Sequence, residues 1–269
     1  MKTRIISAIG GAIILASILY AGGFWVVITC FAINLIATYE ALKLVPYNQA
    51  RILTYTFVIV FMTLALISPN LTNFIYGNII ICSLLITICI LYAIVSKSSH
   101  PPYKRIIYMC GIPIYTGFLL SHILLIYQGT SLPEESNLKI LLFTLIITFT
   151  TDTGAYFFGT LFGKIKIAPT ISINKTLEGS IGGFVSGVIM AVLVSILLNM
   201  EFPLLQILTV GVAISLSAQL GDLLESKLKR IINTKESGRF MPGHGGLLDR
   251  IDSLIITLPV AYYFFWAIS

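Results

Sequence analysis

Apolar runs long enough to cross a lipid bilayer recur along the whole chain, and they constrain its fold more than any other feature. The bilayer core offers no water to the backbone, so a spanning segment pairs its own N–H and C=O groups, and a spanning helix needs about 20 apolar residues. The composition agrees, because 57% of the residues are hydrophobic and 10% are charged, whereas soluble domains carry about 25% charged residues. The sequence therefore predicts an all-α polytopic membrane protein.

The apolar runs predict nine transmembrane helices, of which the first three are short for a full crossing. The first run has no clear cleavage site behind it, so we expect a span there rather than a signal peptide. The predicted spans are residues 5–20, 24–39, 52–67, 74–95, 106–127, 138–158, 179–198, 204–224 and 248–268.

The basic residues fall on one side of this topology. When the nine spans alternate in direction, Lys139 is the only Lys or Arg on the opposite side. Cytoplasmic loops are enriched in Lys and Arg, so the basic side is predicted to be cytoplasmic. We therefore expect a multi-pass protein of the cell (inner or plasma) membrane, with the N-terminus cytoplasmic and the C-terminus outside.

The acidic residues concentrate in the second half of the chain, on or near the predicted cytoplasmic loops. We therefore expect residues 1–105, with Glu40 closing the second span, to form a scaffold of transmembrane helices. Residues 106–269 are predicted to carry the chemistry, with cytoplasmic loops at 159–178 and 226–250. The clustered acids are Asp152, Glu178, Asp222, Glu225, Glu236, Asp249 and Asp252.

Two pairs of carboxylates have the i, i+3 spacing that places side chains on one face of a helix. Asp222 and Glu225 lie near the end of the eighth span, and Asp249 and Asp252 begin the ninth. An unpaired charge at membrane depth costs a few kcal/mol or more. The two pairs together point to a hard cation such as Mg²⁺. The alternative is structural, with Asp249 favoured by the helix dipole and Glu225 paired with Lys229.

The loop before the seventh span has the composition of a phosphate-binding segment. Ser172, Asn174, Lys175 and Thr176 supply hydroxyls, an amide and an ammonium group just before a helix start, where backbone N–H groups attract anions. The alternative is that these cations only mark the cytoplasmic side. The following cytoplasmic loop adds Lys229, Arg230, Lys235 and Arg250.

The glycines fall into two groups with different predicted roles. Small residues spaced by four let transmembrane helices approach closely, whereas the three glycines around His244 favour tight turns and close approach to a ligand. His244 is open as a base, a phosphate contact or a loop brace. The spaced set is Ala155, Gly159, Gly163, Gly179, Gly183 and Gly187, and the loop set is Gly243, Gly245 and Gly246.

The four cysteines lie in or beside apolar segments, and none forms a CxxC pair. We expect them to be buried and reduced, with neither a disulfide framework nor a zinc site. They are Cys30, Cys82, Cys89 and Cys110.

The C-terminal half carries a series of motifs: DTGAY at 152–156, GDLLES at 221–226, SKLKR at 226–230, Lys235 and PGHGGLLDRID at 242–252. In this order the motifs resemble the signature of the phosphatidate cytidylyltransferase (CDP-diacylglycerol synthase) family. The sequence departs from the family pattern at three positions, where the family usually has other residues. They are Ile173 in place of proline, Glu236 in place of aspartate, and Met241 in place of Leu, Ile or Phe.

The resemblance implies an enzyme that converts CTP and phosphatidate to CDP-diacylglycerol and diphosphate at the cytoplasmic membrane face. It implies a Mg²⁺ cofactor and leaves a second cation such as K⁺ and a homodimer open; no nucleic-acid partner is expected. Asp222 and Asp249 would be the main metal ligands, with Glu225 and Asp252 as close partners. Phosphates would meet Lys175, Lys229, Arg230, Lys235, His244 and Arg250, and the substrate path would be lined by Ser172, Asn174 and Thr176, with Asp152 a weaker candidate.

Other activities fit part of this pattern. A CTP-dependent polyprenol or phytol kinase shares the nucleotide and the metal but attacks the γ-phosphate, and a transferase for an ether lipid differs in its lipid. An ion-coupled transporter or channel also places acids within the membrane. Transport predicts a polar path through to the outer side, whereas here the acids gather at one face. The long signature favours the cytidylyltransferase.

Overall fold

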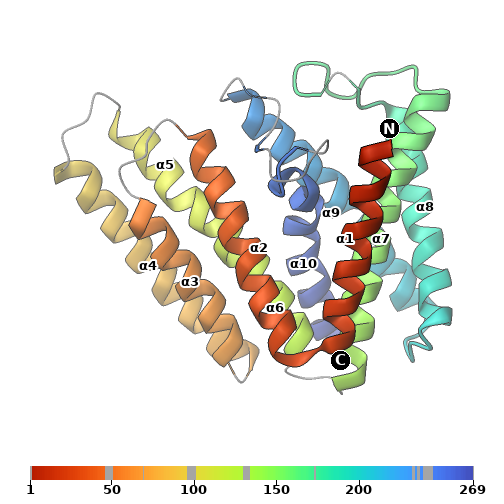
Figure 1. Ribbon diagram of the computed structural model, residues 1–269, viewed down its shortest axis with the longest axis horizontal. Helices are drawn as coiled ribbons and strands as arrows, with labels where there is room; N and C mark the ends of the chain where they lie inside the picture. Colours follow the sequence, from red (N-terminus) through yellow and green to blue (C-terminus); the bar gives the residue numbers. More distant parts are fainter. Residues whose placement is uncertain are drawn as a thin grey trace. The chain divides into compact units, whose positions relative to one another are not determined.

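The chain folds as a set of long α-helices, as predicted (Figure 1). The computed structural model describes residues 2–45, 51–68, 70–95, 101–129, 134–172, 174–231, 234, 237–238 and 245–268. Within these ranges no residue lies in a strand, and Lys166 and Thr176 form an isolated bridge. The all-α fold class is therefore confirmed for the described part of the chain.

Each predicted span coincides with a helical segment. The fifth span is one continuous rod in which a π-helical turn follows Pro113, a residue that has no N–H to donate to the helix. The segments are α1 (Lys2–Ala21), α2 (Gly23–Leu44), α3 (Arg51–Ile67), α4 (Leu71–Val95), α5 (Pro102–Ile112), η1 (Pro113–Leu119), α6 (Leu120–Gln128), α7 (Glu134–Phe162), α8 (Leu177–Leu197), α9 (Leu204–Ile231) and α10 (Leu248–Ile268).

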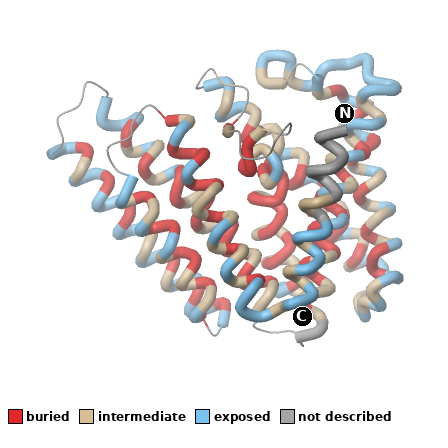
Figure 2. Tube along the Cα trace, in the orientation of Figure 1, coloured by how far each residue is buried: buried red, intermediate tan, exposed pale blue. Residues whose placement is uncertain are grey.

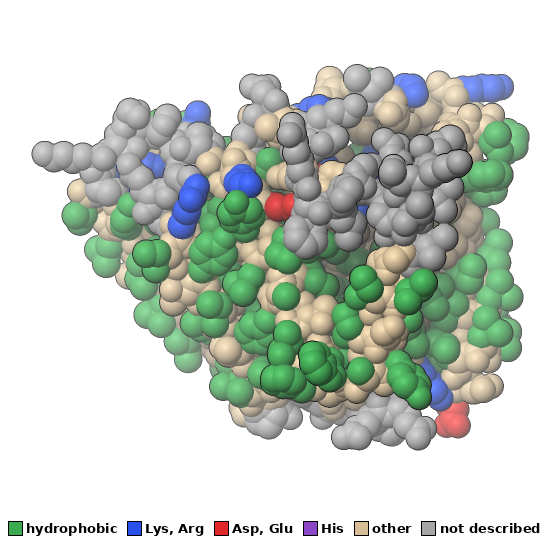
Figure 3. All heavy atoms as spheres, viewed as in Figure 1, with side chains coloured by type: hydrophobic (Ala, Val, Ile, Leu, Met, Phe, Trp, Pro, Cys, Tyr) green, Lys and Arg blue, Asp and Glu red, His purple; other side chains and the backbone are tan. Residues whose placement is uncertain are grey.

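Seven of the described helical segments are long and apolar enough to cross a membrane. They are α2, α4, the α5–η1–α6 rod, α7, α8, α9 and α10. The shorter apolar α3 has 17 residues and occupies the third predicted span. Apolar side chains cover much of the visible helical surface (Figure 3). The side of α8 gives one example, since Ile181, Val185 and Ile189 follow a four-residue spacing and are about half exposed, as expected of contact with lipid.

The helices form two compact units. The first contains residues 1–124 and 236–250, and the second contains residues 125–235 and 251–269. In the first unit α3 packs against α2, α4 and η1, around a core that includes Phe57, Phe61 and Leu85. One pair of buried polar groups there is joined by a hydrogen bond of 2.9 Å between the hydroxyls of Thr38 and Thr116.

In the second unit α7 and α8 pack most closely, and glycine makes this possible. A Cβ atom on Gly183 would lie 2.6 Å from the carbonyl oxygen of Thr151, and one on Gly179 would lie 2.6 Å from that of Ala155. The predicted packing role of these glycines is confirmed. α9 joins the same bundle, and α10 is tied to α7 by a hydrogen bond of 3.2 Å between Thr148 and Thr257. The buried residues line the inner faces of these helices (Figure 2).

Charge divides along the helices of the second unit. Lys139 lies near the start of α7 and donates to the carbonyl oxygen of Asn199, just beyond the end of α8. Lys164 and Lys166 follow the other end of α7, and Lys175 precedes α8. The lysines of the loop between α7 and α8 are therefore a full helix length away from Lys139, as the topology requires. Cys30 and Cys89 are buried as predicted, whereas Cys82 and Cys110 are only partly buried.

The glycine contact between α7 and α8 can be tested by adding one methyl group. Gly183→Ala places a Cβ atom against the backbone of α7, so the helices must separate, at a cost on the order of 1–3 kcal/mol. We expect a lower midpoint of thermal unfolding in detergent. Gly111→Ala is the matched control, because its Cβ atom would meet no other atom within 4 Å. Equal midpoints for the two variants would contradict the close packing.

Candidate active site

The loop between α7 and α8 is pinned to the start of α8. The N–H of Leu177 donates to the carbonyl oxygen of Ile165 over 2.8 Å, and the N–H of Ile167 donates to that of Lys175 over 3.2 Å. The carboxylate of Glu178 accepts the N–H of Lys164 over 2.9 Å. These contacts fix the backbone on both sides of Lys175, so its side chain starts from a defined point.

Thr176 closes this loop as the N-cap of α8. Its hydroxyl accepts the N–H of Gly179 over 3.2 Å, and the residue is buried. Glycines make room for it, because a Cβ atom on Gly163 would lie 2.7 Å from the Thr176 hydroxyl oxygen. Thr was predicted here to line a substrate path, and its capping role adds a structural reason for the same residue.

A cavity of about 290 Å³ lies beside this loop, entirely within the second unit. The predicted phosphate-binding segment and two of the predicted acids share its wall, although they come from different helices and a loop. The sequence did not predict Tyr156, Ser180 and Gln219 as members of the site. The lining residues are Asp152, Ala155, Tyr156, Ile167, Ser172, Asn174, Lys175, Thr176, Gly179, Ser180, Gln219, Asp222 and Leu223.

Lys175 and Asp222 form an ion pair across the cavity wall. The Lys175 Nζ lies 2.9 Å from a carboxylate oxygen of Asp222, and the two side chains are 21% and 38% exposed. The Asp222 carboxylate therefore remains open to a ligand in the cavity, whereas the Lys175 Nζ itself is buried against it. Gln219, one turn earlier on α9, donates to the carbonyl oxygen of Ser180 over 3.1 Å and ties α9 to α8.

Gly221 brings α9 against α10 next to this pair. A Cβ atom there would lie 2.8 Å from the carbonyl oxygen of Asp252 and 3.1 Å from the Cα of Ser253. Asp252 is 9% exposed and accepts the N–H of Ser253 over 2.7 Å. Asp152, Asp222 and Asp252 are close enough to repel one another electrostatically, with Lys175 near all three. This excess of carboxylates favours a bound cation.

Three other predicted residues have partners away from the cavity wall. Glu225 is 2% exposed and forms an ion pair with Lys229, one turn further along α9. Arg230 donates from Nε to the carbonyl oxygen of Ile171 over 3.0 Å and so braces the loop that carries Ser172. The structural alternative for the Glu225–Lys229 spacing is confirmed. Their predicted contacts with metal or phosphate stay predictions.

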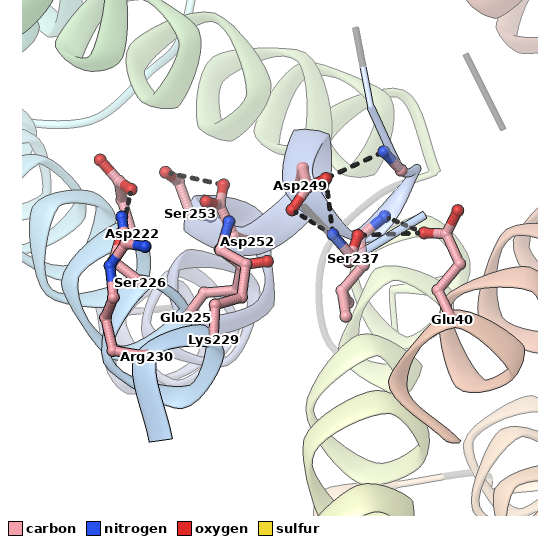
Figure 4. A network of polar contacts seen from close by, with 12 residues as sticks. Glu40, Asp222, Glu225, Ser226, Lys229, Arg230, Ser237, Asp249, Asp252 and Ser253 are labelled. Carbon is pink, nitrogen blue, oxygen red and sulfur yellow. Dashed lines mark hydrogen bonds and ion pairs between the residues drawn. The ribbon is translucent and has the colours of Figure 1, made fainter. Parts of the chain in front are cut away.

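The glycine-rich segment before α10 belongs to the first unit, and two carboxylates organise it (Figure 4). Asp249 accepts the N–H of Ser237 over 3.0 Å and that of Gly246 over 2.9 Å. Glu40 accepts the N–H of Leu248 over 2.8 Å and the hydroxyl of Ser237 over 3.4 Å. The predicted role of Asp249 as a metal ligand stays a prediction, and its two N–H partners give it a structural role in holding Ser237 and Gly246.

Several predicted positions lie outside the described residues. They are Ile173, Lys235, Glu236, Met241, Gly243 and His244. Arg250 is described and is exposed at the start of α10.

Glu40 is the functional candidate that sequence reasoning missed, because it ends a span in the half of the chain assigned to scaffold. One sequence signal pointed to it: it is the only Asp or Glu among residues 1–133. An acid at membrane depth is a candidate for function by default.

Metal binding here depends on how closely the carboxylates are grouped. Among the described residues, no three His, Cys, Asp or Glu side chains are grouped closely enough to hold an ion by themselves. Mg²⁺ does not require such a group, because it binds through one or two carboxylates with waters and substrate phosphates. Asp152 and Asp222 both line the cavity. The residues present therefore fit a Mg²⁺ ion that is bound together with a phosphorylated ligand.

A cavity at the ends of apolar helices, with lysine, hydroxyl and carboxylate groups on its wall, is suited to a membrane protein that handles phosphate groups. The chain belongs to the cytidylyltransferase family, whose family model matches residues 2–268. It is 33% identical over 263 residues to the phosphatidate cytidylyltransferase of Staphylococcus haemolyticus, covering 97% of each chain. It is 28% identical over 268 residues to that of Bacillus subtilis, covering 98% of this chain and 97% of the relative.

The contact of α9 with α10 can be tested at Gly221. In Gly221→Ala the added methyl group meets the backbone at Asp252, so we expect α10 to move away and unfolding by SDS to occur at lower detergent fraction. Circular dichroism gives the midpoint. Leu220→Ala is the control, since Leu220 is 57% exposed. A midpoint for Gly221→Ala at or above that of the control would contradict the arrangement.

Proposed function

We propose that this protein is a phosphatidate cytidylyltransferase, which joins CTP and phosphatidate to give CDP-diacylglycerol and diphosphate. The observation that carries the proposal is the shared cavity wall of Lys175, Asp222 and the hydroxyl-rich segment before α8. The names of the relatives from Staphylococcus and Bacillus support the same reaction.

The reaction asks for positioning and charge neutralisation. A phosphate oxygen of phosphatidate attacks the α-phosphorus of CTP and forms a new P–O bond. The bond from that phosphorus to the bridging oxygen breaks, and diphosphate leaves with the electron pair. The attacking phosphate is already an anion near neutral pH, so little base catalysis is needed. Two anions must instead be held in line against their repulsion.

The cavity residues divide this work. Lys175 supplies a positive charge at the wall, and Ser172, Asn174 and Thr176 bring polar groups from the adjoining loop. Asp222 both orients Lys175 and would hold Mg²⁺, with Asp152 across the same wall. When bound, Mg²⁺ supplies a Lewis acid that neutralises phosphate charge. Asp249 and Glu225 are proposed to support this site through the contacts described above.

Apolar side chains at the cavity wall favour a lipid as the second substrate. Tyr156 and Ile167 line the cavity and are 74% and 42% exposed. Phe157 and Leu161 lie in the same end of α7 and are also exposed. Acyl chains can therefore stay in the membrane beside α7 while the phosphate reaches Lys175. We place the site at the cytoplasmic face of the cell membrane, on the basis of the basic loops.

The assignment can be tested with CTP labelled at the α-phosphate. With phosphatidate and Mg²⁺ in detergent, we expect label to enter the lipid and diphosphate to be released. Asp222→Asn and Lys175→Met should each lower this turnover by about 100-fold or more, since each removes a charge from the site. Glu201→Gln, in the exposed connection between α8 and α9, should leave it unchanged.

Two outcomes would replace the proposal. Release of labelled CDP on addition of a polyprenol, without transfer to phosphatidate, would indicate a lipid kinase. Absence of turnover with either lipid would favour a transporter built on the same fold.

The orientation can be tested by labelling single cysteines with a membrane-impermeant maleimide. Lys166 and Glu201 lie beyond opposite ends of α8 and are both exposed. In intact cells we expect Glu201→Cys to be labelled and Lys166→Cys to be labelled only after permeabilisation, with the unmodified chain as the background. The reverse pattern would place the cavity outside.

A further inference from the structure

Glu40 is a buried carboxylate that the reaction as described does not use. The residue is 3% exposed and lies near the end of α2. It is the first Asp or Glu in the sequence. A buried charge is costly unless hydrogen bonds satisfy it. Its partners therefore indicate what it is for.

Glu40 accepts hydrogen bonds from Ser237, in the segment before α10, and from Leu248, the first residue of α10. Its Oε2 accepts the N–H of Leu248 over 2.8 Å and the hydroxyl of Ser237 over 3.4 Å. The segment is also shaped around this carboxylate, because a Cβ atom on Gly246 would lie 2.6 Å from Oε2. Gly238 is just as tight against the Glu40 side chain. Two glycines and two donors thus enclose one carboxylate.

The Glu40 contacts complement those of Asp249. Ser237 gives its N–H to Asp249 and its hydroxyl to Glu40. On the other side of the segment, Gly246 gives its N–H to Asp249 and Leu248 gives its N–H to Glu40. The two carboxylates together tie Ser237 to the first residues of α10 (Figure 4).

The position of Leu248 matters because α10 begins there. The first N–H groups of a helix have no partner within the helix and carry partial positive charge, so a carboxylate held there fixes the helix start. Asp249 follows directly, and Asp252 lies three residues further on the same face. A shift of Leu248 therefore moves Asp249, its neighbour in the same unit.

We propose that Glu40 is a positioning residue for the reaction: it fixes the start of α10 and thereby the placement of Asp249. This inference rests on the proposed function. It also gives the N-terminal helices a task beyond scaffolding, since α2 supplies the carboxylate.

The test compares Glu40→Ala, Glu40→Gln and Thr38→Val. Thr38 is buried on the same helix and is hydrogen-bonded to Thr116, so Thr38→Val removes a buried contact without touching the segment before α10. We expect Glu40→Ala to lower kcat by about 100-fold with little change in KM for CTP, because misplacement by about 1 Å costs that much. Glu40→Gln keeps an oxygen acceptor for Leu248 and should recover part of the rate. Thr38→Val should lower the unfolding midpoint and leave kcat unchanged.

Hydrogen exchange provides a readout that does not depend on turnover. We expect the amide of Leu248 to exchange faster in Glu40→Ala than in the wild type, and to be unchanged in Thr38→Val. If the wild-type protein transfers no label to phosphatidate, the proposed function is wrong. The exchange rate of the Leu248 amide would still test whether Glu40 fixes the start of α10. Equal exchange and equal kcat in Glu40→Ala and Thr38→Val would overturn the inference.

A milder pair of variants covers the case in which Glu40→Ala does not fold. Ser237→Ala removes only the hydroxyl that donates to Glu40, and Glu40→Gln removes only the charge. If the two groups act together, the double variant should lose less than the product of the two single losses in kcat. If the two single losses in kcat multiply in the double variant, Ser237 and Glu40 act independently, and the inference is overturned.

Discussion

Each charged group that is placed among apolar helices needs a partner, and this requirement shapes the structure around the site. Asp222 is met by Lys175, Glu225 by Lys229, and Asp249 by two backbone N–H groups. Glu40 is met by Leu248 and Ser237. The cost of an unpaired charge at this depth is a few kcal/mol or more, comparable to a large share of the stability of a domain. Lysine side chains and backbone N–H groups of loops and helix ends therefore lie against these carboxylates.

Close backbone approach then decides which of these groups share a cavity. Gly179 and Gly183 let α8 lie against α7, and Gly221 lets α9 lie against α10. The ends of these helices carry Asp152, Asp222 and the loop with Lys175, so glycines buried between helices set the spacing of charges at the surface. An enzyme that binds phosphates between helix ends gains from such rigidity, because catalysis by positioning depends on sub-ångström placement.

Much of this arrangement could be predicted because its signals are local. Hydropathy predicts nine spans, each of which coincides with a helical segment or with the α5–η1–α6 rod. Four-residue spacing identifies the packing role of Gly179 and Gly183. The segment from Ser172 to Thr176 and the acid Asp222 were predicted separately and do share the cavity. Gln219 and Glu40 escaped prediction, since their partners Ser180 and Leu248 lie 39 and 208 residues away in the chain.

The sequence by itself determined the membrane class, the helices, the family and the residues that carry charge, since all of these follow from composition and from motifs along the chain. Only the tertiary structure decided which charges meet a partner from another element, as Asp222 meets Lys175. The i, i+3 spacing of Asp222 and Glu225 suggested a shared ligand, yet one lines the cavity with Lys175 and the other is buried against Lys229. Spacing fixes the face of a helix, whereas the pairing of charges depends on which neighbouring backbone comes within hydrogen-bonding distance.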